Sequence, residues 1–210
     1  MRSGMRFVVT AGPTREYLDP VRFLSNPSTG KMGFAVARAA AERGHKVVLV
    51  AGPVGLGTPK GVVRIDVTSA RQMFAAVKES LGDGDCVFVA TAAVADWRPV
   101  KCAAQKLKKS QMSGTIRLAR NPDILKSVKC RHKIGFAAET CDLMREAARK
   151  CHEKGLEMVV ANDVTQKNAG FGSDTNKVVF VKKNGDVEAL RMMGKLAVAR
   201  RIVRFAEDLA

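Results

Sequence analysis

A long polar loop near the N-terminus holds the first residues that could bind a charged ligand. It runs from Gly12 to Thr29 and leads into an alanine-rich segment with helical periodicity, 30–43. The first N–H groups of a helix have no partner inside the helix, so they attract phosphate groups. The loop therefore predicts anion binding, with an elaborate helix cap as the alternative. It is not a Walker A motif, because methionine follows Gly30-Lys31. The candidate phosphate ligands are Arg22, Ser28, Thr29, Gly30 and Lys31.

A second group of charged residues lies near the middle of the chain. The segment 92–99 contains Asp96, and Lys106-Leu107-Lys108-Lys109 places three lysines within four residues. Such a run is commonly a solvated loop. A mobile cationic flap at a sheet edge can also close on a triphosphate and neutralise charge during its transfer. Spacing alone leaves both interpretations open.

Several kinds of chemistry are excluded by the motifs that the chain lacks. Its five cysteines are an odd number without a C-x-x-C pair, and neither close Cys/His pair has zinc-binding spacing. We therefore expect reduced thiols and no metal-centred redox chemistry. The first turn lacks G-x-G-x-x-G, and the sole tyrosine, Tyr17, has no lysine four residues later. Nicotinamide-dependent chemistry is not expected.

Composition and charge narrow the class of protein. The 210 residues are 46% hydrophobic, and 36 Lys and Arg against 20 Asp and Glu give a formal net charge of +16. Such a field attracts anions, so a basic nucleic-acid-binding module without enzymatic activity is the alternative to an enzyme. Only 5% of the residues are aromatic and no RNA-stacking motif is present, so we do not expect nucleic acid as a partner. The sequence has no signal-peptide core and no apolar run of the ~20 residues that a membrane span needs, so we expect a cytoplasmic protein without membrane contact.

Strands and helices alternate along the chain. Short apolar runs predict strands at 5–11, 46–51, 62–67, 85–90, 115–119, 133–138 and 157–161. Helical spacing predicts helices at 30–43, 70–81, 121–128, 142–154 and 192–209, with Ser69 capping the second and Asn121-Pro122 beginning the third. Asn184-Gly185 joins 177–182 to 187–190 as a β-hairpin.

This alternation predicts one domain, residues 1–210, with a three-layer, doubly wound α/β fold. Its sheet is expected to be mostly parallel and Rossmann-like, with a C-terminal β-hairpin. Ligands of open parallel sheets bind beyond the carboxyl ends of the strands. Loops rich in small or polar residues occupy such positions at 11–14, 90–96, 135–140 and 161–164. They predict a nucleotide-sized site at that edge.

Together these loops resemble the phosphopantothenoylcysteine synthetase (phosphopantothenate–cysteine ligase) family, the second activity of a bacterial flavoprotein of coenzyme A biosynthesis. Pro27 stands where histidine is common and Trp97 where tyrosine is common, at positions without an assigned chemical role. The matching strings are in register along nearly the whole chain: TAGPTRE at 10–16, LDPVRFLSNPSTGKMG at 18–33, AAVADWRP at 92–99, KLKK at 106–109, NPDIL at 121–125, GFAAET at 135–140, ANDV at 161–164 and GFGSD at 170–174.

The resemblance implies a two-step ligation that depends on Mg²⁺. The carboxylate of 4′-phosphopantothenate attacks the α-phosphate of CTP and releases pyrophosphate. The amine of cysteine then displaces CMP from the acyl-cytidylate. The resemblance also implies a homodimer, for which the hairpin Lys177–Leu190 is the expected contact. A phosphopantothenoylcysteine decarboxylase domain or protein is a further expected partner.

The resemblance also assigns roles to individual positions. Asn26 corresponds to the asparagine that serves the acyl-cytidylate and the cysteine step, and Lys106 to a lysine that contacts the nucleotide phosphates, so both are expected to be catalytic. Without the resemblance, Phe136 would be interpreted as a core residue and the Lys150/Lys154 pair as a solvated helix face. The implied nucleotide-binding residues are Ala90, Thr91, Ala92, Asp96, Lys106, Pro122, Asp123, Ile124, Leu125, Phe136, Lys150 and Lys154.

Overall fold

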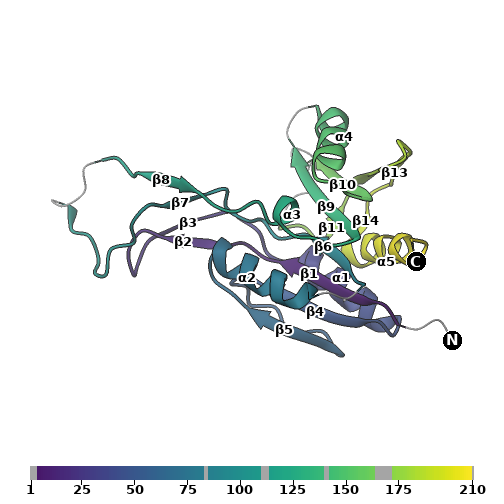
Figure 1. Cartoon of the computed structure of the whole chain (residues 1–210), viewed down its shortest axis with the longest axis horizontal. Helices are drawn as coiled ribbons and strands as arrows, with labels where there is room; N and C mark the ends of the chain where they lie inside the picture. The colour runs from purple at the N-terminus through teal and green to yellow at the C-terminus, as the bar shows by residue number, and fades with distance from the viewer. Residues whose placement is uncertain (1–3, 83–84, 110–113, 140–141, 164–171, 210) are drawn as a thin grey trace.

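One sheet of eight strands forms the centre of the protein (Figure 1). The computed structural model describes residues 4–82, 85–109, 114–139, 142–163 and 172–209. The strands of the sheet are β1 (Arg6–Ala11), β4 (Lys46–Ala51), β5 (Val62–Asp66), β6 (Val87–Ala90), β9 (His132–Glu139), β10 (Met158–Asp163), β12 (Val178–Lys182) and β13 (Val187–Ala189). Their order is β13-β12-β10-β9-β6-β1-β4-β5. The strands from β10 to β5 run parallel, whereas β12 and β13 form an antiparallel hairpin at the edge. The predicted sheet and hairpin are confirmed.

Helices cover both faces of this sheet. On one face lie α1 (Lys31–Glu42) and α5 (Lys195–Glu207); on the other lie α2 (Ala70–Leu81), the short α3 (Ile124–Ser127) and α4 (Leu143–Glu153). Neighbouring strand residues point to opposite faces. Val9 accordingly packs in the α1–α5 layer and Val8 in the α2–α3 layer. This arrangement confirms the predicted three-layer, doubly wound fold. In the described ranges, no helix is long and apolar enough to cross a membrane.

The helix ends follow local chemistry, with one correction to the sequence analysis. The side chain of Ser69 accepts the N–H of Gln72, whose side chain reaches back to the cap, so the predicted N-cap of α2 is confirmed. Asn121 and Pro122 do not begin α3, contrary to the prediction. The N-cap is Asp123, whose carboxylate accepts the N–H of Lys126 at 3.1 Å. The side chain of Asn121 donates instead to the carbonyl of Ala95 at 2.8 Å.

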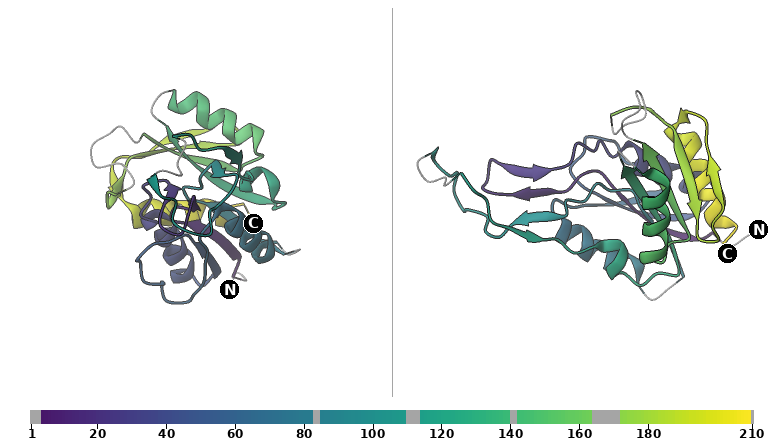
Figure 2. Two further views of the ribbon diagram at one scale, coloured as in Figure 1. Left: turned by 90° about the vertical axis from the view of Figure 1, so that its left-hand side faces the viewer. Right: turned by 90° about the horizontal axis from the view of Figure 1, so that it is seen from above.

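Two short hairpins extend from the sheet as a narrow projection (Figures 1 and 2). One consists of β2 (Arg15–Tyr17) and β3 (Phe23–Ser25), and the other of β7 (Trp97–Pro99) and β8 (Leu118–Arg120). The described residues between 15 and 25 and between 97 and 120 are called the arm below. The sequence analysis expected irregular loops and a further strand of the sheet at 115–119. Instead, β8 pairs with β7 in a separate two-stranded sheet.

A buried aspartate fastens the two hairpins of the arm together. The carboxylate of Asp19 accepts backbone N–H groups of Val21 and Arg22 at 2.9 and 2.8 Å, and that of Leu107 at 3.2 Å. Its second oxygen also pairs with the Arg22 guanidinium at 2.5 Å. The hydrogen bonds from Arg22 hold the pKa of Asp19 well below its usual range, against the opposing effect of burial. Asp19 therefore positions both Arg22 and the segment that carries Lys106.

Candidate active site

A crevice opens beyond the carboxyl ends of β6 and β9 and encloses about 680 Å³. The position agrees with the general rule for parallel α/β sheets. It unites loops that lie far apart in the sequence. The predicted site residues that line it are Asn26, Ala90, Ala92, Asp96, Pro122, Asp123, Ile124, Leu125, Phe136, Lys150 and Lys154.

Charged groups from α3 and α4 face each other across one wall of the crevice. The Nζ atom of Lys154 lies 2.8 Å from a carboxylate oxygen of Asp123. Partial burial acts to raise the pKa of Asp123, but the hydrogen bonds from Lys154 and from the N–H of Lys126, together with the charges of these two lysines, lower it overall. Lys150 lies one helical turn before Lys154 and lines the same crevice. This wall therefore offers two ammonium groups to an anionic ligand.

Lys133 stabilises this wall of the crevice by two hydrogen bonds to the main chain. Its ammonium donates to the carbonyl oxygens of Leu125 and Lys154 at 3.1 and 2.6 Å. It therefore fastens the end of α4 to the short helix α3. Partial burial lowers the pKa of Lys133. The main chain of 122–125, the predicted nucleotide-contacting segment, is thereby held against the end of α4.

Asn26 ties the loop after β3 to the loop after β6. Its side-chain amide donates to the carbonyl oxygens of Ala93 and Val94 at 3.2 and 3.3 Å. A neighbouring contact joins the N–H of Ala93 to the carbonyl of Gly12 at 2.9 Å. Asn26 thus stands at the mouth of the crevice with its amide orientation fixed by two carbonyl groups. An amide in this position can support a polar group of a bound ligand.

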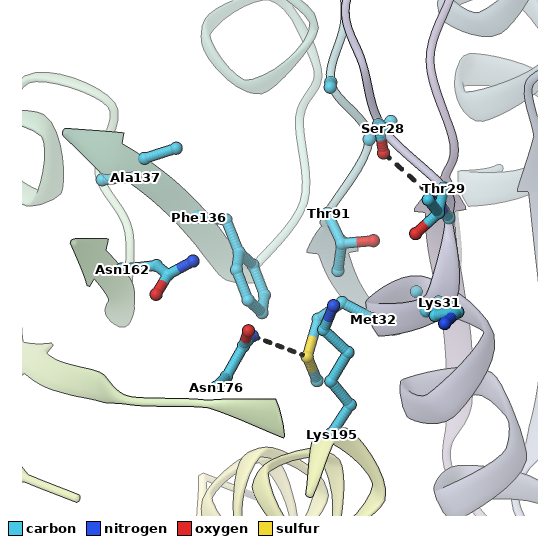
Figure 3. A pocket seen from close by; sticks show the side chains of 15 residues that line it. Ser28, Thr29, Lys31, Met32, Thr91, Phe136, Ala137, Asn162, Asn176 and Lys195 are labelled. Atoms are coloured by element: carbon cyan, nitrogen blue, oxygen red, sulfur yellow. Dashed lines mark hydrogen bonds between the residues drawn. The ribbon is translucent and has the colours of Figure 1, made fainter. Parts of the chain in front are cut away.

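A smaller chamber of about 130 Å³ adjoins the crevice (Figure 3). Its predicted residues are Ser28, Thr29, Gly30, Lys31 and Thr91, and the predicted residues Ala92 and Phe136 line both spaces. Gly30 caps α1 with a φ of 77°, in the left-handed region that favours glycine. A Cβ at Gly33 would lie 2.4 Å from Oγ1 of Thr91 and 2.5 Å from Cβ of Ala11. Only glycine therefore lets α1 approach the carboxyl end of β1 so closely.

Three polar residues of the chamber were missed by the sequence analysis. Asn162, Asn176 and Lys195 face Phe136 from β10 and from the C-terminal part of the chain (Figure 3). Lys195 is buried and donates to the carbonyl of Ser173. Burial, and then the charge of Lys31, lower the pKa of Lys195. Lys31 itself forms an ion pair with Asp174 at 2.6 Å.

A sequence signal for Lys195 did exist. It is the first residue of α5, where the positive end of the helix dipole disfavours a cation. A lysine at such a position is therefore placed for a reason other than helix stability. Asn162 belongs to the family string ANDV at 161–164, but the resemblance implies no role for it. Asn176 lies outside all of the family strings.

Two predicted residues do not reach the crevice of their own chain. Lys106 is exposed on the arm, and Arg22 is engaged there with Asp19 and with the carbonyl of Leu107 at 2.8 Å. Neither lines the crevice or the chamber. Positions 140, 164 and 170–171 of the predicted strings lie outside the described residues. In the part of the chain that the structure describes, no group of three His, Cys, Asp or Glu could hold a metal ion.

Comparison with known proteins identifies the family. The profile described as "DNA/pantothenate metabolism flavoprotein C-terminal domain" matches residues 2–209. The chain belongs to this family. A relative named coenzyme A biosynthesis bifunctional protein CoaBC, from Vibrio parahaemolyticus, is 44% identical over 98% of this chain and 53% of its own. CoaBC of Bacillus subtilis is 46% identical over 96% of this chain and 50% of its own. The chain thus spans about half the length of these relatives.

Solved structures agree with this family assignment. The C-terminal domain of a CoaBC protein matches with a TM-score of 0.83 and 39% identity, over 99% of this chain and 96% of that one. A Cab2 variant in complex with phosphopantothenate-cysteine has a TM-score of 0.77 over 97% of this chain and 86% of that one. At 16% identity, that likeness shows the fold alone. The resemblance to the synthetase domain of the bifunctional protein is confirmed.

Proposed function

We propose that this family member joins 4′-phosphopantothenate to L-cysteine through an acyl-cytidylate, with CTP as co-substrate. The observation that carries the proposal is the assembly of one crevice from residues on four separate segments that the synthetase resemblance assigned to the nucleotide. The names of the CoaBC relatives support a place in coenzyme A biosynthesis. CTP and cysteine are cytoplasmic metabolites, so we place the enzyme in the cytoplasm.

The proposed reaction has two balanced steps. A carboxylate oxygen of phosphopantothenate attacks the α-phosphorus of CTP, and pyrophosphate leaves with the electrons of the broken P–O bond. The amine of cysteine then attacks the acyl carbon, CMP leaves, and the ammonium proton passes to solvent. Both steps need positioning and charge compensation rather than a protein nucleophile. The described lining of the crevice fits this requirement, because it contains lysines and two side-chain amides but no cysteine or histidine.

The charged groups divide the proposed work. Lys150 and Lys154 compensate phosphate charge at the crevice wall, and Lys31 with the start of α1 does so in the chamber. Asn26 supports the acyl-cytidylate at the mouth of the crevice. Mg²⁺ is commonly held by one or two carboxylates together with substrate phosphates. Asp96 and Asp123 are the carboxylates lining the crevice, so we propose that Mg²⁺ arrives on the triphosphate and not in a preformed protein site.

The arm supports a homodimer in which each chain completes the site of the other. Lys106 and Arg22 lie on the arm, outside the crevice of their own chain. The arm also exposes large apolar side chains, which mark interaction surfaces. They are Val21, Phe23, Trp97, Val100, Ile116 and Leu118, exposed by 39 to 55%. We propose that the arm of one chain packs on a second copy and brings Lys106 to that copy's crevice.

Contact through the Lys177–Leu190 hairpin stays a prediction. Its strand β13 is the outermost strand of the sheet, as edge pairing between subunits would require. The CoaBC relatives are bifunctional and about twice as long. We further propose a phosphopantothenoylcysteine decarboxylase, as a domain or a separate protein, as the functional partner.

A pyrophosphate-release assay tests the proposed function. The chain is incubated with 4′-phosphopantothenate, cysteine and Mg²⁺, with CTP or ATP in parallel. We expect release that depends on phosphopantothenate and is faster with CTP. Release that ignores phosphopantothenate contradicts the ligase. Tight duplex binding with a steep salt dependence, in place of turnover, would favour the nucleic-acid-binding alternative.

A further inference from the structure

Two thiols lie side by side at the end of the sheet opposite the crevice. The Sγ atoms of Cys86 and Cys130 are 3.7 Å apart. Cys86 immediately precedes β6, and Cys130 lies two residues before β9. These strands pair in parallel, with Val87 opposite His132. Neighbouring strands are about 4.8 Å apart, a backbone separation that a disulfide spans. The chain is therefore already placed for a bond between these two sulfur atoms.

The two thiols differ in acidity. A hydrogen bond from Cys130, and the nearby charge of Arg6, lower the pKa of Cys86 to about 7, although burial acts in the opposite direction. The same coupling and its own burial raise the pKa of Cys130. Cys130 is held nearby by contacts to the carbonyl oxygens of Cys86 and His132 at 3.2 and 3.4 Å. Cys86 thus has the character of an attacking thiolate and Cys130 that of a resolving thiol.

A cavity of about 410 Å³ leads to Cys86 from the protein surface. Arg6 and Lys46 line it, and Asp85 is the one carboxylate among the described residues of its wall. Arg131 lies 3.8 Å from Asp85 and compensates that negative charge. The approach to the sulfur is therefore cationic, which favours an anionic reactant. The remaining lining residues are Gly4, Met5 and His132.

We propose that Cys86 and Cys130 form a dithiol site that reacts with anionic low-molecular-weight disulfides. The Cys86 thiolate attacks one sulfur of the small disulfide, forms a mixed disulfide and releases one small thiolate. Cys130 then loses its proton to solvent and attacks the Cys86 sulfur, which releases the second small thiolate. The product is a Cys86–Cys130 disulfide, and the two electrons reside on the reduced small thiols. This site is independent of the proposed ligase activity.

Peptide mapping after treatment with oxidised glutathione is the direct test. The fully reduced chain is equilibrated with excess oxidised glutathione, quenched with acid, alkylated and digested. We expect a peptide pair linked through Cys86 and Cys130, with a mass lower by two hydrogens than the reduced peptides. The exposed Cys102 should carry glutathione or the alkylating group instead. Recovery of both Cys86 and Cys130 as alkylated thiols would overturn the proposal.

Serine variants test the order of the steps. Cys130→Ser removes the resolving thiol, so glutathione should remain attached to Cys86. Cys86→Ser should leave Cys130 unmodified, and Cys102→Ser, the matched control, should still form the internal link. Serine is nearly isosteric with cysteine, and circular dichroism checks that each variant is folded. Modification of Cys130 in Cys86→Ser at the rate of the parent chain would refute the assigned roles.

A charge variant tests the recognition of the anion. Lys46→Gln should slow linking by oxidised glutathione about threefold at low salt, with a smaller effect as salt increases. Lys60→Gln removes another exposed lysine, which does not line this cavity, and should not slow the reaction. Equal rates for both variants would contradict a cationic approach to Cys86.

Discussion

At the scale of single residues, Asn26 has a structural role besides its proposed chemical role, and the two have to be told apart by experiment. Its amide holds the loop after β6 by two hydrogen bonds. Asn121 performs a comparable task, because it donates to the carbonyl of Ala95 in the same loop. The two asparagines both line the crevice. Comparing them separates the loss of a loop contact from the loss of a ligand contact.

We predict that Asn26→Ala slows the amide-forming step more than pyrophosphate release. Loss of one oriented polar group at a reacting centre costs roughly 100-fold in rate, and rapid-quench kinetics with labelled phosphopantothenate would then show accumulated acyl-cytidylate. Asn121→Ala should slow both steps alike, because it only loosens the loop. An equal loss of both steps in Asn26→Ala would refute the assignment.

At the scale of elements, the close approach of α1 to the end of β1 shapes the chamber. Gly33 allows it, and the hydroxyl of Thr91 donates to the carbonyl of Thr10 at 2.5 Å in the same contact. A methyl group at Gly33 would lie 2.4 Å from that hydroxyl and 2.5 Å from Cβ of Ala11. The start of α1 would therefore have to move away from the sheet.

We predict that Gly33→Ala lowers the free energy of unfolding by about 1–3 kcal/mol, as overpacked sites do. It should also weaken nucleotide binding, since the first turn of α1 lines the chamber. Urea unfolding and nucleotide titration measure the two effects. Gly57→Ala is the control, because a Cβ there meets nothing within 4 Å. Equal stability of the two variants would show that α1 adapts without strain.

The arm depends on the ionised state of Asp19. Because its folded pKa is lowered by the hydrogen bonds of Arg22, its stabilising contribution is complete above the unfolded pKa of about 4. That contribution is lost as pH falls from there toward the folded pKa.

We predict that Asp19→Asn lowers the unfolding temperature at pH 7. As the pH falls below about 4, the difference in unfolding temperature between the variant and the parent chain should decrease. Thermal unfolding followed by circular dichroism measures this. Asp66→Asn, which removes a largely exposed partner of Arg64, should show a much smaller difference. Parallel pH curves for the parent chain and Asp19→Asn would contradict the role of Asp19.

The arm also shows where sequence interpretation reached its limit. Runs such as Lys46–Ala51 predicted their strands because uninterrupted apolar residues suit a buried strand. The strands β2, β3, β7 and β8 have three residues each, too few for a recognisable period. The long-range hydrogen bond from Leu107 to Asp19 joins the two hairpins and has no local signal. Strings matched to a family located the crevice, whereas Asn176, which belongs to none of those strings, required three-dimensional contacts.

At the scale of the whole molecule, the position of Lys106 decides how the proposed dimer must work. We predict that mixing the inactive variants Lys106→Ala and Asn26→Ala, with exchange of subunits, restores about a quarter of the parent activity. Half of the dimers are then mixed, and each has one site with an intact body and an intact arm. Activity measured before and after exchange gives the result.

Two variants on the same part of the chain provide the control for this mixing. Asn26→Ala and Phe136→Ala both alter the crevice itself, so their mixture should stay inactive in any dimer. Failure of the Lys106→Ala and Asn26→Ala mixture to regain activity would show that the arm serves its own chain or none.

Phe136 has a consequence for the design of inhibitors. Its ring is a partition shared by the crevice and the chamber. Two weakly bound fragments, one on each side of the ring, can be joined by a short tether that passes its edge. The second fragment then binds at an effective concentration in the millimolar range, so that avidity far exceeds either fragment alone.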